Sequence, residues 1–130
     1  MAYYTRFEIY IPIVYQLTDE DPQTGKRRSE VHALPAELLR EFIDATRKRF
    51  EGITQANPLG LAPFKGWWQK KNTKTIVIDH LTYVFGLAKI HESDEAKTFF
   101  TDWKERLEFS LQQQEILVIY FPVQTIGDFF

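Results

Sequence analysis

Five side chains that suit ligand binding occur within residues 63–85: Trp67, Trp68, Asp79, His80 and Tyr83. Aromatic rings offer apolar stacking surface, and a carboxyl or imidazole group can act as an acid or a base. Asp79 and His80 are neighbours on a predicted strand, so they point to opposite faces and cannot form a dyad with each other. A polar strand residue is more often bonded to a neighbour or to water. We therefore treat the five as candidates for ligand binding and predict no catalytic residue.

The adjacent tryptophans raise a structural question of their own. Successive strand residues face opposite sides of a sheet, so Trp67 and Trp68 cannot both enter one core unless both faces are covered. We expect one ring to pack under helices and the other to lie on an open sheet face. A second subunit or a small-molecule ligand would cover that exposed ring.

Several function classes lack the residues they need. The chain has no phosphate-binding loop, no dinucleotide glycine fingerprint and no nucleophile elbow. It also has no cysteine, and its three histidines are scattered without ligand spacing. We predict neither a cofactor nor a metal. The net charge of −2 makes nucleic acid an unfavoured partner, although four lysines surround the tryptophans: Lys65, Lys70, Lys71 and Lys74.

The elements that would position these residues follow from hydrophobic periodicity. Alternation from Phe7 to Ile13 predicts a strand, with an irregularity at Pro12. The polar segment at about 18–33 reads as a long loop. Helical spacing predicts helices over 35–50 and from a Ser93 N-cap onward. The remaining predicted strands are a broken one ending at the tryptophans, one over 75–87 and one over 116–123.

This order of elements, strand, helix, strand, strand, helix, strand, predicts a ferredoxin-like α+β fold in a single domain over residues 1–130. Its antiparallel sheet carries both helices on one face and leaves the other face bare. The last strand, ILVIYFPV, is apolar on both faces and has no lysine to protect its edge. We therefore expect a homo-oligomer, namely a dimer, formed through the open face or this edge.

The segments FEIYIP, RFEGIT, GWW and WKERLEFSLQQQEILVIY together resemble those of a group of small bacterial proteins with a ferredoxin-like fold. The resemblance covers most of the chain outside the segment 18–32. It implies a fold and no established activity, so no functional residue is carried over from the group.

The sequence thus favours a soluble, self-associating binding or regulatory module without a catalytic signature. The alternative is a small-molecule enzyme that resembles dimeric α/β-barrel proteins, with an aromatic cavity and Asp79 or His80 inside it. No apolar run reaches the length of a membrane helix, so no membrane partner is expected. The lack of cysteine fits a cytoplasmic location.

Overall fold

The computed structural model describes residues 2–20, 23–50, 53–56, 64–69, 75–111 and 115–127. For residues 15–20, 27–30, 56, 64–69 and 79 the description covers the backbone alone. The helices in this part of the chain are α1 (Ala36–Phe50) and α2 (Ser93–Ser110), and a 3₁₀-helix, η1 (Ile90–Glu92), leads into α2. None of these helices is long and apolar enough to cross a membrane.

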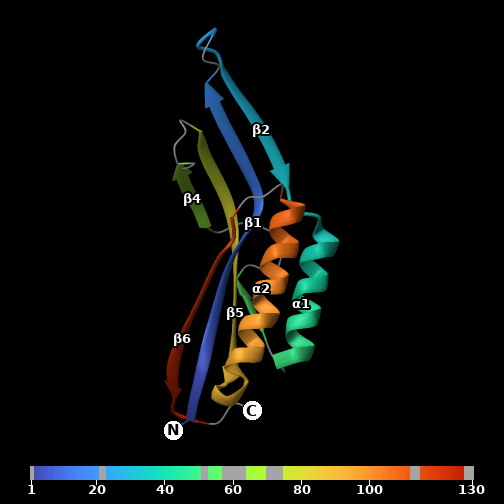
Figure 1. Ribbon diagram of the computed structural model, residues 1–130, viewed down its shortest axis with the longest axis vertical. Helices are drawn as coiled ribbons and strands as arrows, with labels where there is room; N and C mark the ends of the chain where they lie inside the picture. The colour runs from blue at the N-terminus through green and yellow to red at the C-terminus, as the bar shows by residue number, and fades with distance from the viewer. Residues whose placement is uncertain are drawn as a thin grey trace.

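The described strands form one antiparallel sheet: β1 (Ala2–Glu20), β2 (Arg27–Ala33), β3 (Thr54–Ala56), β4 (Phe64–Gln69), β5 (Ile76–Lys89) and β6 (Leu117–Thr125). Two long strands, β1 and β5, pair at its centre. Beyond β1 lie β6, along its first half, and β2, along its second half. Beyond β5 lie β3 and β4. Both helices lie on the same side of this sheet, so the chain is α+β (Figure 1).

A core rich in rings fills the space between sheet and helices. Phe7, Ile9 and Ile11 of β1 are at most 3% exposed. The Phe7 ring lies 4.8 Å from that of Phe100 on α2, and Phe42 of α1 meets Phe100 edge-on at 6.4 Å. The predicted apolar stripe of the second helix is confirmed, since all its members lie in or against this core: Ala96, Phe99, Phe100, Trp103, Leu107 and Leu111.

The polar segment at 18–33, predicted as a loop, instead forms a hairpin. β1 continues to Glu20, and β2 returns from Arg27 after a turn in which Gly25 adopts φ 68°, a conformation that suits glycine. The register sets Glu20 opposite Arg27 and Asp19 opposite Arg28. Residues of opposite charge that face each other across two antiparallel strands favour strand pairing. A polar composition alone is therefore weak evidence for a loop. The hairpin extends past the ends of the helices (Figure 1).

Two local predictions have different outcomes. The irregularity expected at Pro12 is confirmed, because the register between β1 and β5 shifts between Pro12 and Val14. The predicted N-cap, Ser93, is wrong by one residue: Glu92 holds the cap position and Ser93 is the first residue of α2. The Ser93 hydroxyl instead lies 2.6 Å from Oγ1 of Thr5 on β1. This hydrogen bond ties the start of α2 to the sheet.

The other predicted elements agree with the structure where it describes them. The first helix and the strands over 75–87 and 116–123 correspond to α1, β5 and β6 within a few residues. The broken strand is present as the two separate pieces β3 and β4. The segment KKNTK at 70–74 also predicts a hairpin turn, and it lies outside the described residues.

Candidate functional site: the open face of the sheet

One face of the sheet is turned away from both helices, and we call it the open face. Because Phe7 and Ile9 point toward the helices, the alternating residues Arg6, Glu8 and Tyr10 lie on the open face. All three are half-buried. The register sets these residues beside the same parity of β5 and β6, so the open face is continuous across the three strands.

Five of these side chains form a cluster that we call the Arg6 cluster: Arg6, Glu8, Tyr10, Tyr83 and Phe85. The Arg6 guanidinium donates from Nε to Glu8 Oε1 at 2.9 Å and from Nη2 to the Tyr83 hydroxyl at 2.6 Å. Its Cζ lies 3.9 Å from the centre of the Phe85 ring, which is a cation–π contact. The Tyr10 hydroxyl donates to Glu8 Oε2 at 3.4 Å, and the Tyr10 and Tyr83 rings lie 5.1 Å apart.

The electrostatics of the cluster follow from these contacts. Burial lowers the pKa of Arg6, but its hydrogen bonds to Tyr83 and Glu8 more than offset this effect and raise the pKa above its ordinary value. Burial, reinforced by the negative charge of Glu8, raises the pKa of the Tyr10 phenol. Arg6 therefore stays charged and Tyr10 stays neutral across physiological pH. The cluster offers aromatic surface and an ion pair whose two charges offset each other. These features suit ligand binding better than proton transfer.

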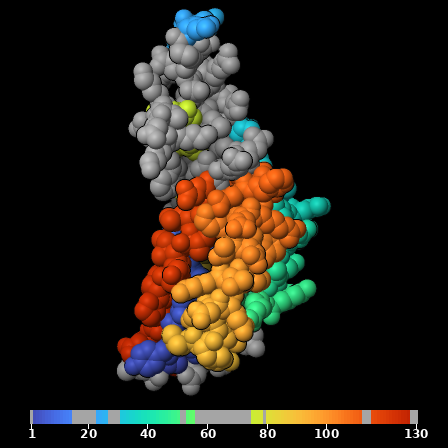
Figure 2. Space-filling view, in the orientation of Figure 1, coloured from blue at the N-terminus to red at the C-terminus, as the bar shows by residue number. Residues whose placement is uncertain are grey.

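Next to the cluster, β6 presents an apolar row to water, which we call the β6 row: Leu117, Ile119 and Phe121. Their exposed fractions are 44%, 37% and 36%. The register sets them beside Tyr10, Glu8 and Arg6 respectively, on the open face. On the opposite side of the same strand, Tyr120 is 52% exposed. Figure 2 shows β6 as a continuous strip of surface beside α2.

The predicted site residues are only partly brought together. Tyr83 lies in the Arg6 cluster, whereas His80 is exposed and has the opposite parity on β5. The backbones of Trp67 and Trp68 lie on β4, opposite Ile78 and Val77 of β5.

Asp79 lies on β5 between Gly66 of β4 and Tyr15 of β1. The side chains of Asp79 and of both tryptophans lie outside the description. That one tryptophan ring packs in the core and the other lies on the open face therefore stays a prediction.

Sequence reasoning missed Arg6, Glu8 and Phe85 as members of a site. A signal was present, since Arg6, Glu8 and Tyr10 share one parity of a strand whose other parity, from Phe7 to Ile13, is apolar. That pattern identifies a polar face on β1. It does not identify the residues of β5 that this face contacts, because Arg6 and Tyr83 are 77 residues apart. In the described residues, no group of three or more His, Asp or Glu side chains could hold a metal ion.

Comparison with known proteins adds no identification: no family model matches the chain, and neither the curated proteins nor the solved structures give a significant match.

Proposed function

We propose that this protein is a binding or regulatory module that forms a homodimer through its open face, with the β6 row at the centre of the interface. The observation that carries the proposal is the exposure of Leu117, Ile119 and Phe121 in one row on a strand that, among the described residues, pairs only with β1. An apolar row at the edge of a sheet is costly to leave in water and is typical of a surface that another molecule covers.

The charge pattern favours a second copy of this chain as the occupant. None of the nine residues of β6 is charged. Beside them, Arg6 and Glu8 neutralise each other through a 2.9 Å ion pair. A twofold axis brings identical surfaces together, so a self-complementary interface must avoid like charges. The β6 row and the Arg6 cluster meet this condition.

Packing of the two open faces suits this surface better than continuation of the sheet at the β6 edge. Pro122 lies within β6 and has no backbone N–H. A proline in an edge strand usually turns its nitrogen toward the free edge, where a neighbouring strand would need a donor. An intermolecular ladder along β6 would therefore be interrupted, whereas stacked faces need no backbone donor.

We further propose that the sheet is a ferredoxin-like arrangement with two modifications. If β3 and β4 are two pieces of one strand and the β1–β2 hairpin is an extension, the central strands are β1 and β5 and the edges are β6 and β3/β4. This pairing supports the proposal. The bacterial ferredoxin-like group that the motifs resemble and a cytoplasmic location, suggested by the lack of cysteine, belong to the same proposal.

The test replaces the centre of the β6 row with a charge. Ile119→Glu is expected to weaken the dimer by at least about tenfold, because the carboxylate would be desolvated in the interface without a partner. Ile119 is 37% exposed in the single chain, so the fold should tolerate the change. The matched control is Phe109→Glu, an equally drastic change at a residue of α2 that is 86% exposed.

Light scattering coupled to size-exclusion chromatography would measure both variants beside the wild type. Loss of the dimer in Ile119→Glu alone supports the proposed interface. A dimer that persists in Ile119→Glu but is lost in Phe109→Glu would place the interface on α2 and contradict the proposal. Far-ultraviolet circular dichroism of each variant would confirm that assembly, and not folding, had changed.

A further inference from the structure

A depression with a mixed lining lies at the end of the sheet where β1 begins and β5 ends. Its volume is about 620 Å³, and its lining comes from three elements: Ala2, Tyr3, Tyr4, Lys89, Ile90 and His91. The depression is wide open to solvent, so a small organic ligand bound there would remain partly exposed to water. Tyr4 and Lys89 are register partners on β1 and β5, so the two strands meet at the depression, and η1 follows directly after Lys89. None of the described residues that line it is among those that the sequence singled out.

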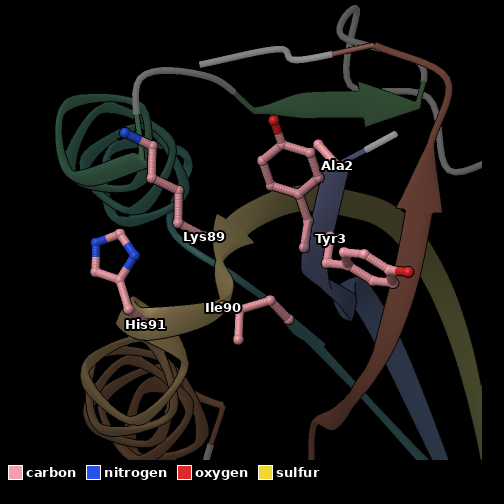
Figure 3. A pocket seen from close by; sticks show the side chains of 6 residues that line it. Ala2, Tyr3, Lys89, Ile90 and His91 are labelled. Atoms are coloured by element: carbon pink, nitrogen blue, oxygen red, sulfur yellow. The ribbon is translucent and has the colours of Figure 1, made fainter.

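The polar side of this depression comes from Lys89 and His91. Lys89 supplies an ammonium group and His91 an imidazole that is 77% exposed. Both side chains lie on one side of the depression in Figure 3. Among the described residues that line it, none carries a carboxylate. The nearby acidic group is Glu92, whose Oε1 lies 3.8 Å from His91 Nε2, a distance too long for a hydrogen bond.

The other side of the depression is apolar and exposed. Tyr3 is 61% and Ile90 49% exposed, which is unusual for large apolar side chains that lie near each other. In Figure 3 the Tyr3 ring lies across from the Lys89 and His91 side chains, with Ile90 between them. A flat apolar group placed against Tyr3 and Ile90 would leave an attached anionic group within reach of Lys89.

We propose that this depression binds a small amphipathic anion, in which a carboxylate or phosphate group is joined to a flat apolar body. Lys89 pairs with the anionic group, His91 donates a hydrogen bond to it, and Tyr3 and Ile90 cover the apolar body. The inference does not rest on self-association, because no lining residue belongs to β6. A monomer that binds such an anion would support this inference and contradict the proposed dimer.

The test is a titration of the ¹⁵N-labelled full-length protein followed by two-dimensional NMR, with phenyl phosphate as the probe. Saturable shifts are expected at the amides of Tyr3 and of residues 89–91. Inorganic phosphate and benzyl alcohol, which each carry half of the proposed chemistry, should bind at least about fivefold more weakly. Benzoate should bind at the same amides if a carboxylate serves as well as a phosphate.

Two lysine substitutions, one in the depression and one far from it in the sequence, provide the matched variants. Lys89→Gln is expected to weaken phenyl phosphate binding about fivefold, since it removes the charge that pairs with the anion. Lys48→Gln, at an exposed lysine of α1, should leave the affinity unchanged. Equal affinity in the two variants would overturn the proposal, as would equal binding of inorganic phosphate or benzyl alcohol or shifts that do not saturate. An unchanged spectrum of unliganded Lys89→Gln would establish that its fold is intact.

Discussion

The two faces of the central sheet are built from alternate residues of the same strands, yet they are stabilised in different ways. On the helix side, Phe7 and Ile9 are almost fully buried under Phe100 and its neighbours. On the open face, Arg6 and Glu8 are held mainly by contacts within the sheet, to each other and to Tyr83. The first face derives its stability from burial against other elements, and the second from lateral pairing between strands.

The side chains of the open face are therefore held in place without being fully covered. Hydrophobic burial contributes in proportion to the area removed from water, so the helix side should dominate the free energy of unfolding. The lateral contacts of the Arg6 cluster contribute less, but they hold its side chains in fixed positions on the surface of the sheet.

The largest effect is expected at the ring that joins both helices to the sheet. Phe100→Ala should lower the free energy of unfolding by about 3–5 kcal/mol, because Phe100 is 4% exposed and its removal leaves a cavity between Phe7 and Phe50. Phe109→Ala on the same helix is the matched control. That ring is 86% exposed, so a change within about 0.5 kcal/mol is expected.

Urea denaturation followed by circular dichroism would measure both values. Similar losses for the two variants would mean that the helix side is not the dominant source of stability.

A smaller effect is expected within the Arg6 cluster. A double-mutant cycle with Arg6→Met and Glu8→Gln should give a coupling energy of about 1 kcal/mol, since the two side chains are 28% and 15% exposed and share a hydrogen-bonded ion pair. The exposed pair Arg106 and Glu41, which joins α2 to α1, is the control and should give a coupling energy near zero. Equal coupling in the two cycles would contradict the claim that lateral pairing stabilises the open face.

The smallest effect concerns the Tyr10 phenol at alkaline pH. Its pKa is raised in the folded state by burial and by Glu8. The unfolded chain therefore loses this proton first as the pH rises past about 10. The stabilisation is complete below that pH and is lost as the pH approaches the folded-state pKa.

Tyr10→Phe should remove this part of the alkaline destabilisation, whereas Tyr3→Phe, at a ring that is 61% exposed, should not. Urea midpoints measured at neutral and alkaline pH would compare the two variants with the wild type. An identical alkaline loss in both variants would show that Tyr10 does not titrate as proposed.

Much of the fold could be predicted because it depends on local periodicity. The stripe that includes Phe100 and Leu107 identifies α2 without reference to any other element. The hairpin at 18–33 could not be recognised in this way, since its polar residues follow neither helical nor strand periodicity and its evidence is the register of Asp19 with Arg28. A charge pairing of that kind becomes visible only once the two strands are aligned.

The candidate site was harder to predict than the fold for the same reason. Tyr83 was selected for its residue type, but its role depends on Arg6, which reaches it across the β1–β5 pairing. The exposure of Leu117 and Phe121 was anticipated from the apolar character of the last strand on both faces. The depression beside Lys89 combines residues from the start of β1, the end of β5 and η1, and it has no signature in the sequence.

Sedimentation velocity of the wild-type protein over a range of micromolar concentrations would show whether the chain self-associates. A homodimer should appear as a species of twice the 15.4-kDa chain mass that dissociates on dilution. A single species of 15.4 kDa at every concentration would contradict the proposed homodimer, because the β6 row would then remain uncovered by a second copy.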